Sequence, residues 1–140
     1  MFSLDPQLQG DTLTLGDFPL CQLLLSNDRQ YPWLILVPRR KAVSEVFELS
    51  DADQQQLWHE VTELGRRVGQ AFAAHKVNIA ALGNVVRQLH VHVIARYEDD
   101  AAWPAPVWGK LPPAPYDAGE VEAVIDRLRP LLGEGFVWAR

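Results

Sequence analysis

Apolar and polar residues alternate with a period of two over residues 88–96, which is the pattern of a strand buried on one side. Leucine and valine side chains share one face of this predicted strand. The polar side chains of the other face are Gln88, His90 and His92. Neighbouring side chains on one face of a strand lie about 6.5–7 Å apart, so both imidazoles could reach one phosphate-sized group between them. The spacing favours a ligand site.

Two earlier stretches also predict strands. Residues 11–25 alternate imperfectly around Gly16-Asp17, which predicts a β-hairpin. After a polar break, the apolar run Trp33–Val37 is closed by Pro38, which is typical of a buried strand. We therefore expect the N-terminal part of the chain to supply three strands of a sheet.

The stretch before the histidines predicts one more strand over residues 76–81 and a turn over residues 82–84. Adjacent strands with a short connection pair antiparallel. The turn therefore brings Asn78 and Asn84 close to the imidazole face, although an Asn in a turn is most often there for its backbone preferences.

Two segments have the periodicity of amphipathic helices. The first begins at Ser50, which is placed to cap it, and runs to Phe72 with apolar residues at helical spacing. The second covers residues 117–132, begins with Asp117 and has Gly133 as its stop signal. Each helix should bury one apolar face in a core.

Residues 97–116 have neither the period-two pattern of a strand nor the helical spacing of apolar residues. Five of the ten prolines fall here, which predicts an extended loop rather than a helix or central strand. We expect its tryptophans, Trp103 and Trp108, to cover the core or a partner subunit. The apolar tail, residues 136–138, is expected to dock on the rest of the chain.

Composition narrows the class of protein. A length of 140 residues predicts a single domain, residues 1–140, and 48% hydrophobic residues are typical of a globular chain. The formal net charge of −5 argues against nucleic acid or an anionic membrane as a partner. The short basic run at residues 39–41 predicts a solvated loop. A single cysteine, no signal peptide pattern and no membrane-length apolar run predict a cytoplasmic protein.

A metal site is an open alternative for the two strand histidines, because His-x-His on a strand can supply two zinc ligands. Such a site needs a third ligand and usually a fourth. The remaining candidates are His59 on the first predicted helix, His75 in the last turn expected at its end, and Cys21. Their spacing offers no ligand set, so we expect no metal and no cofactor.

The segment from about Leu20 to Arg96 resembles the histidine triad (HIT) superfamily, whose signature is His-φ-His-φ-His-φ-φ, with φ an apolar residue. A strand ending in Pro38, a long helix, an Asn-bearing strand and the histidine strand follow in the family's order. The resemblance implies an α+β, HIT-like fold with an antiparallel sheet of about five strands, one long helix and a C-terminal helix. Residues 97–116 look like a branch-specific addition.

The resemblance also implies nucleotide phosphate chemistry. By position, His90 would be the nucleophile that attacks the α-phosphorus. His92 would hold phosphate oxygens, and the backbone carbonyl of Gln88 would orient His90. Charge on the phosphoryl group would be met by an imidazolium, Asn amides and turn N–H groups. Further implied contacts are Asn78 and Asn84 to the phosphate and leaving group, Asn27 to the ribose, and Leu25 and Ile35 as walls of the base pocket.

Two residues depart from the family pattern. Gln88 replaces the first histidine, and Trp33 stands where many members have a further histidine. Because the first position contributes mainly through its backbone, we expect activity to survive. The sequence thus predicts a homodimeric nucleotidyl hydrolase or transferase for dinucleoside polyphosphates or nucleoside phosphoramidates. The alternative is a nucleotide-binding sensor with little turnover.

Overall fold

The chain forms one six-stranded antiparallel sheet with strand order β4-β5-β3-β2-β1-β6 in a computed structural model that describes residues 1–139. This confirms the predicted α+β class and antiparallel sheet, with six strands where about five were expected. The strands are β1 (Thr12–Asp17), β2 (Cys21–Ser26), β3 (Trp33–Pro38), β4 (Lys76–Ala81), β5 (Val91–Arg96) and β6 (Val137–Trp138).

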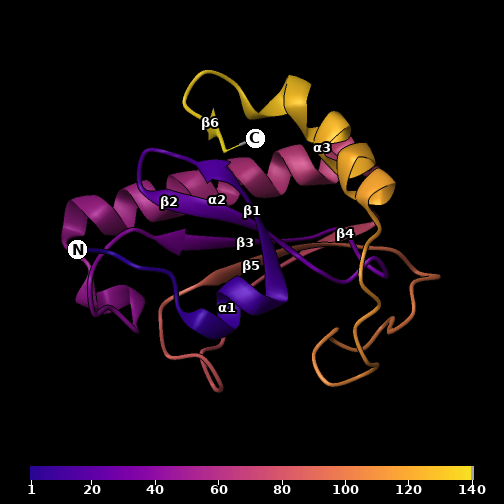
Figure 1. Ribbon diagram of the computed structural model, residues 1–140, viewed down its shortest axis with the longest axis horizontal. Helices are drawn as coiled ribbons and strands as arrows, with labels where there is room; N and C mark the ends of the chain where they lie inside the picture. Colours follow the sequence, from indigo (N-terminus) through magenta and orange to yellow (C-terminus); the bar gives the residue numbers. More distant parts are fainter. Residues whose placement is uncertain (140) are drawn as a thin grey trace.

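The two faces of the sheet are covered by different elements (Figure 1). The long helix α2 (Asp51–Ala71) and α3 (Ala118–Leu132) cover one face, which we call the helix-covered face. The short helix α1 (Pro6–Asp11) and the long loops lie on the other, which we call the open face. A 3₁₀ turn, η1 (Val46–Glu48), precedes α2. Among residues 1–139 no helix is both long and apolar enough to cross a bilayer.

The main core lies between the sheet and the two long helices. Ser50 caps α2 by accepting the backbone N–H of Asp53 at 3.1 Å, as predicted. The apolar stripe of α2 then packs on the β5 residues that point the same way. The buried residues of this contact are Leu57, Val61, Leu64 and Val68 on α2 and Val91, Val93 and Ala95 on β5. Helix α3 adds its own buried stripe, beginning at Val121.

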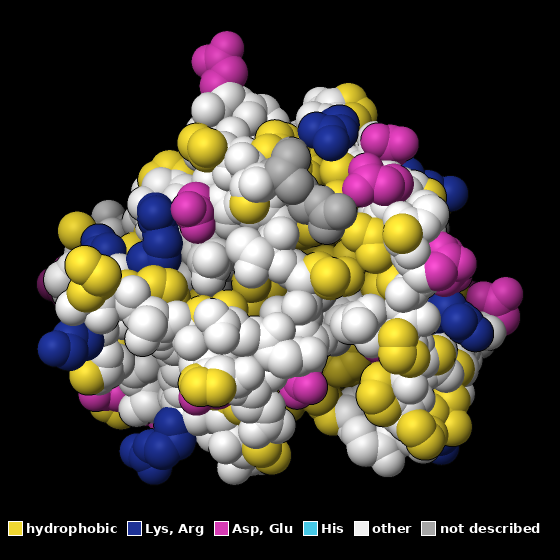
Figure 2. Space-filling model, in the orientation of Figure 1, with side chains coloured by type: hydrophobic (Ala, Val, Ile, Leu, Met, Phe, Trp, Pro, Cys, Tyr) yellow, Lys and Arg dark blue, Asp and Glu magenta, His cyan; other side chains and the backbone are white. Residues whose placement is uncertain are grey.

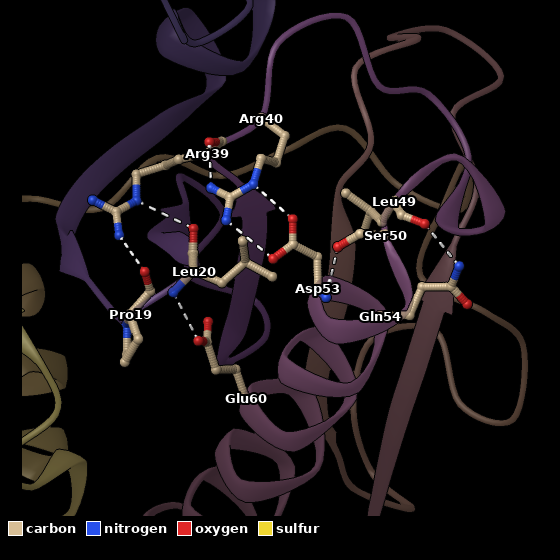
Figure 3. A network of polar contacts seen from close by, with 9 residues as sticks. All are labelled: Pro19, Leu20, Arg39, Arg40, Leu49, Ser50, Asp53, Gln54 and Glu60. Atoms are coloured by element: carbon tan, nitrogen blue, oxygen red, sulfur yellow. Dashed lines mark hydrogen bonds and ion pairs between the residues drawn. The ribbon is translucent and has the colours of Figure 1, made fainter.

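A polar network holds the N-terminal end of α2 against the sheet (Figure 3). Arg39 donates to the carbonyls of Leu20 at 3.2 Å and Pro19 at 2.7 Å, and Arg40 forms a two-contact pair with Asp53. Buried Glu60 accepts the backbone N–H of Leu20 at 2.8 Å. Residues 39–41 form a loop in which Arg40 and Lys41 are exposed, as predicted, and Arg39 and Arg40 add these contacts to it.

The N-terminal hairpin turns later than predicted. Its turn is at residues 18–20, closed by a bond from the Phe18 N–H to the Cys21 carbonyl at 2.8 Å. Gly16 lies inside β1 at a bulge, where a Cβ atom would come within 2.2 Å of the Val137 carbonyl. Close approach of β6, rather than a turn, therefore requires this glycine. The same pairing docks the apolar tail, as expected, with Phe136 buried.

The histidine strand begins later than predicted. Strand β5 starts at Val91, so Gln88 and His90 precede it. The last residue of β4, Ala81, pairs with Val91, and no β4 partner remains for the residues before it. Helix α1 was not predicted at all, although Asp5 caps it and Pro6 occupies its first turn.

Candidate active site

The open face carries a cavity of about 650 Å³ beside the two histidines. Its walls come from the end of α1, the β2–β3 connection, β3, the loop before β5 and the loop after it. The lining includes Leu8, Asp11, Thr12, Asn27, Asp28, Trp33, Ile35, Asn84, Val86, His90, His92, Trp108 and Leu111. A cavity of this volume can enclose a ligand the size of a nucleotide.

His90 borders the cavity and is only 7% exposed. Its Nδ1 lies 2.7 Å from the backbone carbonyl oxygen of Gln88. A carbonyl can only accept a hydrogen bond, so Nδ1 carries the proton in this contact. In the neutral ring, Nε2 is then left with a free lone pair.

His92 has the opposite arrangement. Its Nδ1 lies 2.9 Å from the indole Nε1 of Trp33, which can only donate. The proton of the neutral His92 ring is therefore on Nε2. Burial, together with the neighbouring His90, lowers the pKa of His92 to about 3. His92 is thus a neutral donor near pH 7, and the expectation of an imidazolium is wrong for this residue.

The two imidazoles lie next to each other, with ring centres 5.0 Å apart and planes at 71°. Trp33 and Trp108 enclose His92, at centre distances of 5.7 and 5.1 Å. The buried indole Nε1 of Trp108 has no hydrogen-bond partner within residues 1–139. Trp108 packs against the small core of Tyr31, Ile94, Ala102 and Val107, as expected, and it also lines the cavity.

The loop that carries Trp108 is fixed to the end of β5. Arg96 is 1% exposed and contacts the Asp100 carboxylate at 2.8 and 3.1 Å, with further donation to the Ala105 carbonyl. Burial alone would raise the pKa of Asp100, but hydrogen bonds from Arg96 and three backbone N–H groups lower it to about 2. Trp103 packs on His75 and Arg96. Figure 2 shows hydrophobic side chains gathered at lower right, where this loop runs.

Three of the five predicted substrate contacts line the cavity. They are Asn27, Asn84 and Ile35. The side-chain oxygen of Asn27 accepts the Tyr116 N–H at 2.9 Å, and Asn84 is exposed.

The other two predicted contacts lie elsewhere. Leu25 is fully buried in the core of the helix-covered face, because β2 alternates and only Leu24 of its three leucines points to the open face, on the side of Ser26. Asn78 is on the open face but outside the cavity lining, where its side-chain oxygen accepts from Arg96 at 2.8 Å. Neither prediction of a substrate contact holds for this cavity.

Sequence reasoning missed the contributions of two segments to the site. One is α1 with Thr12, whose signal was Asp5-Pro6. The other is the loop around Trp108, where clustered prolines predicted an extended path but not what it covers. Within residues 1–139 no group of three or more His, Cys, Asp or Glu side chains is placed to hold a metal ion.

Comparison with known families gives a match to the HIT domain over residues 7–99, which include the cavity residues of α1, β3, β5 and both histidines. This chain belongs to the HIT family. A comparison with curated proteins returned no match.

Solved structures agree with this HIT assignment. A histidine triad protein from Bradyrhizobium japonicum is 46% identical, with a TM-score of 0.92, over 94% of this chain and 98% of that one. A histidine triad protein from Marinobacter aquaeolei VT8 is 48% identical, with a TM-score of 0.92, over 94% and 96%. A histidine triad nucleotide-binding protein from Sulfolobus tokodaii shares the fold at 16% identity, with a TM-score of 0.63 over 81% and 78%.

HIT membership supports a nucleotide-binding or hydrolase-type function in general terms. The match ends at residue 99, so the loop with Trp108 and helix α3 lie beyond it. The relatives at 46% and 48% identity nevertheless cover 94% of this chain. The addition after residue 96 is therefore shared with at least part of the family's structures.

Proposed function

We propose that this HIT protein is a nucleotidyl hydrolase or transferase that cleaves at the α-phosphate of its substrate through a nucleotidyl-histidine intermediate. The observation that carries the proposal is the complementary protonation of two adjacent rings at one cavity. His90 has its proton on Nδ1, facing the Gln88 carbonyl, and His92 has its proton on Nε2. One ring can attack while the other donates.

In the first step, the Nε2 lone pair of His90 forms a bond to the α-phosphorus. The bond from phosphorus to the leaving group breaks, and the leaving group departs with its electron pair; an amine leaving group then takes up a proton from solvent. In the second step, water or another hydroxyl acceptor attacks the same phosphorus, the N–P bond breaks, and the acceptor's proton is released. Splitting one displacement into two lowers each barrier.

His92 and Asn84 would stabilise the phosphoryl oxygens during both steps. A donor fixed before reaction is more effective than one that must reorient, and removing one typically costs ~10²–10³ in rate. Trp33 supports this role, because its indole N–H occupies Nδ1 and keeps the His92 proton on Nε2. In this account Trp33 is a positioning residue for His92.

The charge of the cavity favours one of the two substrate classes. Among its lining residues within residues 1–139 there is no Lys or Arg, whereas Asp11 and Asp28 are acidic. A polyphosphate chain would bring several negative charges without a cation to meet them. A nucleoside phosphoramidate carries fewer charges, so we place it first and the dinucleoside polyphosphate second. Asn27 and Ile35 would contact the nucleoside.

The test compares the native chain with His90→Asn on adenosine 5′-phosphoramidate and on diadenosine tetraphosphate. We expect release of AMP by the native chain and nearly none by the variant. His59→Asn is the matched control, because His59 is an exposed histidine on α2. Equal turnover by all three proteins would overturn the proposal.

A second candidate function is a nucleotide sensor with little turnover, which the occupied Nδ1 of His92 favours. With the Trp33 indole on that nitrogen, His92 cannot pass a proton through its ring. Tight AMP binding by calorimetry, with no hydrolysis of either substrate, would support the sensor over the enzyme.

We also propose that the chain forms a homodimer through the edge of β4, in the cytoplasm. Strand β4 ends the sheet, and an unpaired strand edge is a site for pairing with another chain. Ile79 and Leu82 are exposed there. Light scattering should show a dimer for the native chain and a monomer for Ile79→Lys. Val137→Lys, at the opposite end of the sheet, is the control.

A further inference from the structure

The side chain of Gln88, which stands at the first motif position, makes two hydrogen bonds to the N-terminal segment (residues 1–5). Its Oε1 accepts the Asp5 N–H at 2.8 Å, and its Nε2 donates to the Ser3 carbonyl at 2.9 Å. Both partners are backbone groups two residues apart. The amide therefore holds this segment much as a neighbouring strand would.

The N-terminal segment in turn positions a wall of the cavity. Asp5 caps α1 by accepting the Gln7 N–H at 2.8 Å, and Phe2 and Leu4 pack with Leu8 in the small core of the open face. The C-terminal part of α1 and the residue after it line the cavity. These lining residues are Leu8, Gly10, Asp11 and Thr12.

The same residue also contacts the other side of the site through its backbone, because the Gln88 carbonyl accepts from His90. A histidine at this position would keep that carbonyl. Its two ring nitrogens, however, point in divergent directions and could not match Ser3 and Asp5 as the amide does. The replacement of the first histidine by Gln88 therefore adds a contact without removing the one that the reaction uses.

We infer that Gln88 is a positioning residue for substrate binding. Its side chain holds the α1 wall against the nucleotide, while its backbone carbonyl orients the His90 ring. This inference rests on the proposed function. Gln88 thus has two roles that can be tested separately. Removing its side chain should loosen the α1 wall but leave its backbone carbonyl in contact with His90. The effect should therefore fall mainly on KM and only weakly on kcat.

The experiment compares the native chain with Gln88→Ala, both as the full chain. For each protein we would measure steady-state kinetics with adenosine 5′-phosphoramidate, the AMP affinity by calorimetry and the hydrogen exchange rate of the Asp5 amide. Loss of two hydrogen bonds should raise KM and the AMP Kd roughly tenfold and lower kcat less than about threefold. Exchange of the Asp5 amide should accelerate. Gln9→Ala, an exposed glutamine of α1, is the control.

A fall in kcat as large as the rise in KM would overturn the inference, as would unchanged exchange of the Asp5 amide. Accelerated exchange with no AMP binding by the native chain would instead overturn the proposed function. Melting temperatures within a few degrees of one another are expected, since the lost bonds lie at the surface.

Discussion

The two faces of the sheet differ in the side chains that they carry and in the elements that cover them. The helix-covered face is a continuous apolar core, in which α2 packs on alternate residues of β5 and α3 packs on α2. The open face carries polar and aromatic groups, and its cavity is assembled from segments spread between Leu8 and Pro115. One face stabilises the fold, and the other supplies the chemistry. Substitutions on the two faces should therefore change different measured quantities.

The largest expected effect is on the open face. His90→Asn removes the nucleophile, and turnover should fall by at least about 10³, equivalent to about 4 kcal/mol in the activation free energy. Stability should change little, because the ring borders a cavity. Turnover assays check the activity of the variant, and thermal melts on the same preparation check its stability. A large fall in melting temperature would contradict the division between the faces.

The matching substitution on the helix-covered face is Leu64→Ala. Leu64 is 1% exposed in the main core, so the free energy of unfolding should fall by about 2–5 kcal/mol. The folded fraction should keep the native KM, because Leu64 lies across the sheet from the cavity. Urea unfolding and kinetics at a temperature where the variant is folded provide the measurement. A changed KM would show that the faces are coupled.

Asp100 links the loop over the cavity to β5, and its contribution to the free energy of unfolding should depend on pH. Its pKa is about 2 in the folded chain against an ordinary 3.8, so the unfolded chain binds the proton more tightly. The contribution is present above about pH 4 and is lost as the pH falls toward 2, with a size of about 2 kcal/mol. Urea unfolding at several pH values should show this loss in the native chain. Asp100→Asn should lack it.

Trp33→Phe tests the smallest of these effects. The ring remains but the indole N–H is lost, so His92 can exchange between its two neutral forms. We expect kcat to fall roughly tenfold, less than the ~10²–10³ for complete loss of a donor. Nitrogen shifts of the His92 ring should change from an Nε2–H form to a mixture. An unchanged spectrum would mean that Trp33 does not fix the His92 proton.

The helix-covered face was predictable from the sequence, because a buried face repeats at the period of its element. Periodicity located α2 through Leu57, Val61 and Leu64, and it located β5 apart from a start predicted three residues too early. The hairpin turn was misplaced because Gly16 indicated a turn, whereas it serves the close approach of β6. Such long-range contacts leave no local pattern.

The open face was predictable only where a motif marks it. His90, His92 and Asn84 were placed at the cavity by the motif, and Asn27 by its family position. Trp108 and the α1 wall were missed, because their role depends on how distant loops fold together. The assignment of Leu25 to the cavity failed by one residue, since a shift of one along a strand exchanges the two faces.

The most direct test of the proposed chemistry is to trap the intermediate. The native chain is mixed with adenosine 5′-phosphoramidate, stopped within milliseconds in alkali, where phosphorus–nitrogen bonds to histidine survive, and digested for mass spectrometry. We expect an adenylyl group on the peptide that contains His90, located on that residue, and its absence in His90→Asn. Full turnover by the native chain with no labelled His90, or with the label on another residue, would contradict it.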